Sequence, residues 1–98
     1  MEKTKVIARV IAKPGKENEL RDLLRGMLAP THAEEGCEFY ELYESDQPGR
    51  FYFYELWTTK AHLDAHCTTA HFQNLVATAA ELFAEPPEIN LVREVAES

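Results

Sequence analysis

The stretch EFYELYESDQPGRFYFYELW, residues 38–57, holds two aromatic-rich segments separated by a short polar one. Residues 38–44 and 50–57 have the composition that favours β-strands. Between them, Asp46-Gln47-Pro48-Gly49 is typical of a turn, because proline presets its φ angle and glycine accepts the conformation that follows. We therefore predict a β-hairpin over residues 38–57.

The residues before this hairpin predict one strand and one helix. TKVIARVIA, residues 4–12, is rich in β-branched residues and reads as a strand that Lys13-Pro14-Gly15 ends. Residues 16–30 then show the spacing of an amphipathic helix, with Pro30 close to its end. The apolar positions of this helix are Leu20, Leu23, Leu24, Met27 and Leu28.

The residues after the hairpin predict two helices and a last strand. Thr58 or Thr59 can cap a short helix that runs through about His66, and Thr68 or Thr69 can cap a longer one. Pro86-Pro87 ends the longer helix, and residues 88–95 form the strand. The apolar stripe of the longer helix comprises Phe72, Leu75, Val76, Ala79, Leu82 and Phe83.

The element order βαββαβ predicts a single α+β domain over residues 1–98, with a ferredoxin-like four-stranded antiparallel sheet and two helices on one face. The strand at 50–57 is apolar on both faces, with Phe51, Phe53 and Trp57 on one and Tyr52, Tyr54 and Leu56 on the other. Because two helices cover one face only, a large apolar surface would stay exposed in a monomer. We therefore expect a homodimer packed sheet to sheet.

Composition and motifs argue against several classes of partner and cofactor. The net charge of -7 and the scattered basic residues argue against nucleic acid, and no stretch approaches the ~18 apolar residues of a membrane span. Arg9 and Lys13 interrupt the first apolar run, so we expect no secretory signal, a cytoplasmic protein, and free thiols at Cys37 and Cys67. The isolated glycines form no phosphate-binding loop for a nicotinamide or flavin cofactor.

Three of the four histidines fall within residues 58–72, at positions 62, 66 and 71. His62 and His66 have the i, i+4 spacing of a zinc pair. However, a new helix begins before His71, and no carboxylate has a matching spacing, so we predict no metal site.

A pocket role suits two of these histidines better. His66 shares the inward face of its helix with Leu63, where an imidazole facing an aromatic cavity can act as a general base. We expect His71 beside it at the start of the next helix, and His62 mostly facing solvent. The alternative is structural: the histidines would only lock the helix junction by hydrogen bonds.

Two charged residues lie among apolar neighbours. Glu55 falls between Phe53 and Trp57, and Arg9 falls between Ile7 and Ile11. Buried charges usually have partners, and the strands that carry these two are neighbours in a ferredoxin-like sheet. The sequence leaves open whether Arg9 and Glu55 pair.

Four segments together resemble one known family. KPGKENELRDLL (13–24), EEGCEFYELYES (34–45), RFYFYELWTTKAHLDAHCTTAHF (50–72) and EPPEINLV (85–92) look like the antibiotic biosynthesis monooxygenase family, over about residues 5–93. The most specific part is the pattern E-x-W-x5-L-x2-H-x4-H-F. It is formed here by Glu55, Trp57, Leu63, His66, His71 and Phe72.

This resemblance implies a dimeric α/β barrel of ferredoxin-like subunits, with a pocket between helices and sheet in each. It implies oxidation of a quinol or polycyclic phenol by O2 without flavin, haem or metal. Carried onto this sequence, it makes His66 and His71 the candidate catalytic residues. The candidate substrate-binding residues are Tyr40, Phe53, Glu55, Trp57, Leu63 and Phe72.

Related branches of the family suggest alternatives. The haem-degrading branch uses an Asn, a Trp and a His, which align with Ala8, His66 and Val76 here, so the axial ligand is missing and haem is not expected. Another branch isomerises the phosphorylated form of the autoinducer-2 signal, an enediol-forming substrate, and shares the RFYxYE and H-x4-H patterns. Its phosphate would require basic residues at the pocket rim, for which Arg25, Arg50 and Lys60 are the candidates. A third alternative is a non-catalytic ligand-binding dimer.

Overall fold

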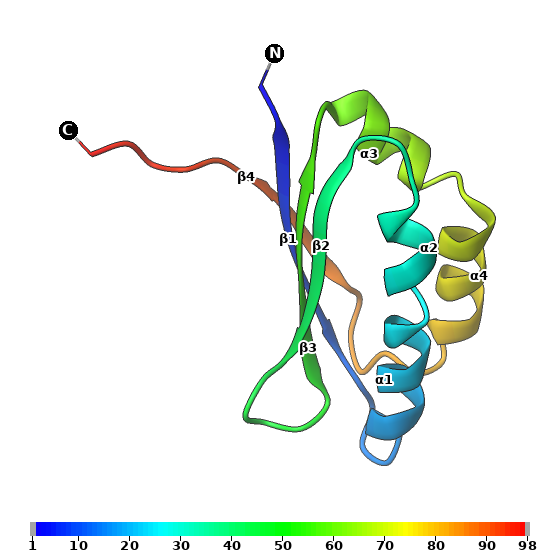
Figure 1. The fold of residues 1–98 in the computed structure, drawn as a ribbon. Coiled ribbons are helices and arrows are strands. Elements are labelled where there is room, and N and C mark those ends of the chain that lie inside the picture. The colour runs from blue at the N-terminus through cyan, green and yellow to red at the C-terminus, as the bar shows by residue number, and fades with distance from the viewer. Residues whose placement is uncertain (1, 98) are drawn as a thin grey trace.

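The computed structural model describes residues 2–97 as a four-stranded antiparallel sheet whose helices all lie on one face (Figure 1). The strand order is β2-β3-β1-β4, which confirms the ferredoxin-like α+β prediction. In chain order the elements are β1 (Thr4–Ile11), α1 (Glu17–Arg25), α2 (Leu28–His32), β2 (Cys37–Glu44), β3 (Arg50–Trp57), α3 (Lys60–His66), α4 (Ala70–Ala79) and β4 (Glu88–Val92).

The register of the two central strands decides which side chains face the helices. Val6 of β1 lies opposite Glu55 of β3, on the covered face of the sheet. Arg9 is three residues after Val6. Because side chains alternate between the two faces of a strand, Arg9 lies on the opposite face, away from Glu55. Arg9 instead forms ion pairs of 2.9 Å with Glu85 and Glu88, which answers the question that the sequence left open.

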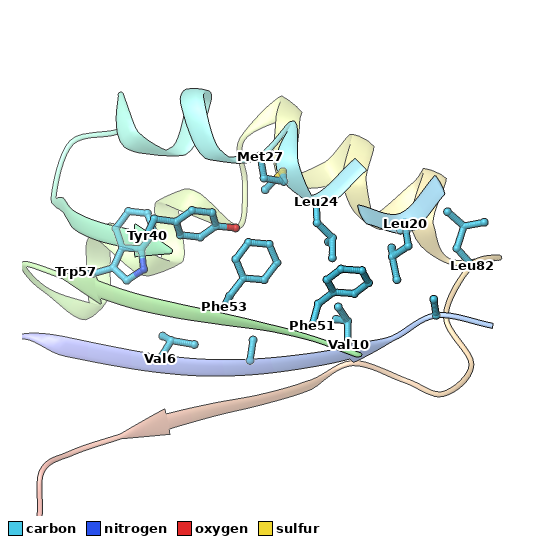
Figure 2. Close-up of a cluster of buried hydrophobic side chains, with 13 residues drawn as sticks. Val6, Val10, Leu20, Leu24, Met27, Tyr40, Phe51, Phe53, Trp57 and Leu82 are labelled. Carbon is cyan, nitrogen blue, oxygen red and sulfur yellow. The ribbon is translucent and has the colours of Figure 1, made fainter. Parts of the chain in front are cut away.

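The core lies between the sheet and the helices (Figure 2). Side chains of β1 and β3 point from the sheet toward α1, and the apolar face of this amphipathic helix packs against them. The largest apolar side chains that are almost fully buried are Trp57, Phe51, Leu20, Leu24 and Val6.

The single helix predicted at 16–30 is wrong, because α1 ends at Arg25 and α2 begins at Leu28. Pro30 has no N–H, so it cannot donate to the carbonyl of Gly26 four residues earlier, and its ring crowds that carbonyl. Met27 bonds instead to the carbonyl of Leu24, which tightens the chain into a turn.

The last helix and strand are also shorter than predicted. Helix α4 ends at Ala79, whereas its apolar stripe continues to Phe83. The backbone of Leu82 accepts from the Lys13 N–H, and Ala84 donates to the Ile11 carbonyl, so this segment bonds to the end of β1 instead of continuing the helix. None of the helices within residues 2–97 is long and apolar enough to cross a membrane.

The face of the sheet that the helices leave open carries a cluster of apolar side chains. Tyr43 of β2 is 52% exposed and Ile7 of β1 is 41% exposed. The strand registers place further side chains on the same face, and the rings of Phe39 and Tyr54 meet at 5.0 Å. We call this the open sheet face; its apolar members are Ile7, Ile11, Phe39, Tyr43, Tyr52, Tyr54, Leu56 and Val92.

Candidate active site

A cavity of about 550 Å³ lies between the sheet and the helices. Its walls are mostly apolar, and none of the residues that line it is a lysine or an arginine. The lining groups able to exchange a proton are Tyr40, Glu55, His66, Cys67 and Glu85. Its apolar lining includes Ala8, Val10, Leu24, Phe53, Leu63, Phe72, Leu75, Val76 and Ile89.

Most of the candidate residues from the sequence meet at this cavity. Six line it directly: Tyr40, Phe53, Glu55, Leu63, His66 and Phe72. Trp57 lies behind the wall, fully buried, with its ring against His66. His71 lines a separate shallow hollow between α1 and α4, so it contacts the cavity only through its neighbours.

His66 is held in an aromatic setting at the end of α3. The residue is only 2% exposed, and its ring centroid lies 4.9 Å from that of Trp57 and 5.1 Å from that of Phe72. The Tyr40 ring closes a further side at 5.7 Å. Helix α3 is fixed at its start by Thr59, whose hydroxyl accepts the His62 N–H, so the position of His66 follows from a defined helix start.

Glu34 joins His66 and His71. Its Oε2 atom lies 2.7 Å from Nδ1 of His66 and 2.6 Å from Nε2 of His71. Both rings can therefore donate to one carboxylate oxygen, which orients them. Glu34 is not among the site residues predicted from the sequence, because it lies 32 and 37 residues from the two histidines and no local pattern marks it.

The junction between α3 and α4 is fixed by Thr69, the residue that caps α4. Its hydroxyl accepts the Phe72 N–H and donates to the His66 carbonyl at 2.8 Å. One hydroxyl thus ties the end of one histidine-bearing helix to the start of the next. The histidines do lock this region by hydrogen bonds, as the structural alternative held, and His66 lines the cavity as well.

His62 does not face mostly solvent, contrary to the prediction. Its Nδ1 atom lies 2.9 Å from the Thr59 hydroxyl, and its side chain is 28% exposed. The ring packs on Gly36, where an added Cβ would lie within 2.2 Å of it. His62 is therefore part of the support for the turn that carries Glu34, and it stands outside the group formed by Glu34, His66 and His71.

Glu55 is a buried carboxyl group on the cavity wall. The Trp57 indole N–H donates to its Oε1 atom at 3.0 Å. Burial raises the pKa of Glu55 to about 7; the Trp57 hydrogen bond opposes this rise, and the negative charge of Glu34 adds to it. At neutral pH, Glu55 can therefore both hold and release a proton.

Tyr40 presents a second proton-bearing group. Burial raises the pKa of its hydroxyl well above the usual range, and the charge of Glu55 raises it further. The hydroxyl therefore keeps its proton near neutral pH, where it serves as a hydrogen-bond donor.

Comparisons with known proteins find a matching family model and similar relatives. The family model described as antibiotic biosynthesis monooxygenase matches residues 4–78. The relative "Putative monooxygenase Rv0793" from Mycobacterium tuberculosis is 36% identical over 93 residues, with 95% of this chain and 92% of the relative covered. YcnE from Bacillus subtilis, which carries the same description, is 32% identical over 83 residues, covering 84% of this chain and 87% of its own.

Solved structures show the same fold. The structure of Rv0793 matches with a TM-score of 0.91 at 34% identity, covering 99% of both chains. That of PA3566 from Pseudomonas aeruginosa also matches with a TM-score of 0.91, at 30% identity, covering 98% of this chain and 97% of the other. The likeness therefore extends over nearly the whole chain.

Proposed function

Because this chain belongs to the antibiotic biosynthesis monooxygenase family, we propose that it is a monooxygenase that oxidises a quinol or polycyclic phenol with O2 and needs no bound cofactor. The observation that carries the proposal is the placement of His66, which lines an apolar cavity while Glu34 holds its Nδ1 atom. An apolar cavity suits a planar aromatic substrate, and a base within it can start the reaction.

The hydrogen bond from His66 to Glu34 selects the nitrogen that can act. With the proton on Nδ1 donated to the carboxylate, the Nε2 atom keeps its lone pair. Within residues 2–97, Nε2 of His66 has no hydrogen-bond partner. It is also not fully buried, because the Thr31 hydroxyl is the one fully buried side-chain polar atom without a partner in that range. Nε2 therefore retains access to the cavity, where it can accept a phenolic proton.

In the proposed reaction, the substrate itself supplies the electrons that reduce O2. His66 removes the O–H proton of a quinol, and the resulting anion passes one electron to O2. The two radicals combine into a ring peroxide anion, which takes back the proton from His66 and becomes a hydroperoxide. Loss of the ring C–H proton breaks the O–O bond, and the outer oxygen leaves as water. Quinol and O2 thus give a hydroxyquinone and water, with no external reductant.

Two further groups supply protons and hydrogen bonds for this sequence. Glu55, whose pKa is raised to about 7, can deliver a proton to the peroxide as its O–O bond breaks. The Tyr40 hydroxyl, which keeps its proton, can donate a hydrogen bond to oxygen as negative charge develops there. We assign Phe53, Leu63 and Phe72 to contact with the faces and edges of the substrate ring.

The charges of the cavity disfavour the isomerase alternative. A phosphorylated substrate would require cations, and Arg25, Arg50 and Lys60 are all absent from the cavity lining. The acidic side chains that line it are Glu55 and Glu85; Glu85 is paired with Arg9, and the carboxylate form of Glu55 would repel a phosphate. A neutral or weakly acidic phenol meets no such penalty.

Oxygen consumption by the purified protein tests the proposal, with a panel of quinols and polycyclic phenols. His66→Ala and His66→Gln should each lower kcat by about 10²–10⁴, the usual contribution of a positioned base. Lys60→Ala, an exposed change on the same helix, is the matched control and should retain activity. Circular dichroism would verify that each variant is folded.

Other outcomes separate the alternatives. Full activity in His66→Gln would contradict the role of His66. Turnover of a phosphorylated diketone that Lys60→Ala or Arg50→Ala weakens would support an isomerase. If no compound is turned over while an aromatic ligand quenches the fluorescence of Trp57, the single tryptophan, the protein is a binding module.

We also propose that the working form is a homodimer packed through the open sheet face. The apolar side chains of this face include Tyr43 and Ile7, which are about half exposed in one chain. Monomers seldom tolerate a contiguous apolar surface of this kind, and a second copy covers it with complementary side chains.

A further inference from the structure

We propose that Glu34, His66 and His71 form a binding site for a divalent transition-metal ion such as Zn²⁺, and that a metal bound there inhibits the enzyme. The three donor atoms, one from each residue, all lie within 4.8 Å of one another. Two imidazoles and one carboxylate are ligands that Zn²⁺ accepts. The binding stands on this geometry alone, whereas the inhibition rests on the proposed function.

The donors converge from three separate parts of the chain. Glu34 comes from the turn between α2 and β2, His66 from the end of α3, and His71 from the first turn of α4. Neighbouring ligand atoms of a tetrahedral zinc ion lie about 3.4 Å apart, as Zn–N and Zn–O bonds of about 2.0–2.1 Å require. The present N–O separations of 2.6 and 2.7 Å would therefore have to widen by less than about 1 Å. A carboxylate on a turn can make that movement.

The site is buried on the side of His66 and Glu34 and partly exposed on the side of His71. The side chains of His66 and Glu34 are 3% and 12% exposed, whereas that of His71 is 24% exposed. His71 also lines the shallow hollow between α1 and α4, which is separate from the large cavity. An ion can therefore enter past His71 without passing through the substrate cavity, and water from that side can complete its coordination.

The metal affinity of the site depends on the hydrogen bonds that its histidine ligands make with other groups. Metal-binding histidines usually donate their second ring N–H to a protein acceptor. Within the described part of the chain, neither Nε2 of His66 nor Nδ1 of His71 has such an acceptor. Loss of such support costs about 10–100-fold in affinity, so we expect reversible binding weaker than that of a structural zinc site.

Inhibition follows from the nitrogen that the metal occupies. Without metal, the Nδ1–H group of His66 donates to Glu34, and Nε2 carries the free lone pair. A metal at Nδ1 takes the lone pair on that atom, so the ring proton must lie on Nε2. His66 then presents a donor to the cavity in place of an acceptor, and it can no longer take the substrate proton.

Titration of the wild-type protein tests the binding. Calorimetry with ZnCl₂ and visible absorption with Co²⁺ should each report one ion per chain. His71→Ala and Glu34→Gln should each lower the affinity at least about 10-fold. Glu35→Gln is the matched control, since Glu35 is the adjacent carboxylate, 93% exposed and outside the site, and it should bind like wild type.

A measurement on the unaltered protein covers the case in which a variant misfolds. In ¹⁵N NMR spectra, Zn²⁺ should shift the ring nitrogens of His66 and His71 and leave those of His32 and His62 unchanged. Absence of stoichiometric binding would overturn the site, as would wild-type affinity in folded His71→Ala and Glu34→Gln.

The inhibition has its own measurement. Oxygen consumption should fall in proportion to zinc occupancy and return when a chelator is added. Undiminished turnover at full occupancy would overturn the inhibition while the binding data stand. If the metal-free protein turns over no quinol, the proposed function and the inhibition fail together, and the titrations alone decide the metal site.

Discussion

Glu55 is a carboxyl group that folding places in an apolar wall, at 6% exposure. Burial raises its pKa from the ordinary 4.5 to about 7, so the folded protein binds this proton more tightly than the unfolded chain does. Between these two values the folded state holds more protons, and the free energy of unfolding therefore falls as pH rises. The stabilisation that the Glu55 proton gives the folded state is complete below pH 4.5 and is lost as pH rises through about 7.

Replacement of Glu55 by Gln should remove this pH dependence. The pKa shift of Glu55 corresponds to a change of about 3 kcal/mol in the free energy of unfolding between pH 4.5 and pH 8. Glutamine retains an acceptor for the Trp57 N–H, so packing should persist. Urea unfolding of both proteins at several pH values checks this, because the difference between them isolates Glu55. Parallel stability profiles would show that this carboxyl group does not titrate as its burial implies.

At the scale of the elements, the turn before β2 places Glu34 between the two histidine-bearing helices. Gly36 in that turn has a φ of +82°, a conformation that side chains rarely adopt. It also lies under the His62 ring, where no Cβ fits. The position of Glu34 therefore depends on a glycine that is required for both backbone and space.

Gly36→Ala should destabilise the fold more than Gly15→Ala does. Gly15 has a similar φ of +86° with open space around it, so Gly15→Ala should cost only the backbone penalty of about 1–2 kcal/mol. Gly36→Ala adds the clash with His62, for about 1–3 kcal/mol more. Urea unfolding measures both.

A double variant identifies the cause of this difference. On a His62→Gly background, Gly36→Ala should lose most of the extra cost, because both the ring and the His62 Cβ, which would lie 2.6 Å from the added Cβ, are gone. Equal losses in the Gly15 and Gly36 variants would mean that the turn moves aside at little cost.

At the scale of the whole molecule, the open sheet face predicts the oligomeric state. Light scattering should give a mass about twice the 11.2 kDa of one chain at micromolar concentration. Tyr43→Glu places a second carboxylate beside Glu41 on this face and should shift the protein toward monomer, since burying an unpaired charge is costly.

Ala77→Glu provides the control, because it adds the same charge at an exposed position of α4, on the helix side of the sheet. It should leave the mass unchanged. A stable wild-type monomer would remove the argument for packing through the open sheet face.

The sequence by itself determined the four strands except for the end of the last, their order along the chain, and which side chains of a strand share one face. Alternation of side chains along residues 50–57 fixes which of them share a face, so Phe53, Glu55 and Trp57 could be assigned together. The spacing of Leu63 and His66 likewise fixes one face of a helix. Such patterns are local, and the backbone geometry of a strand or helix carries them directly into structure.

Only the tertiary structure decided where the helices end and which remote residues meet. Helix α4 stops because residues 82–84 bond to the end of β1, although the apolar stripe continues. Glu34 reaches His66 and His71 across 32 and 37 residues, through a turn that Gly36 and His62 hold in place. No local pattern encodes such a meeting, because it depends on the summed lengths and packing of every element between the partners.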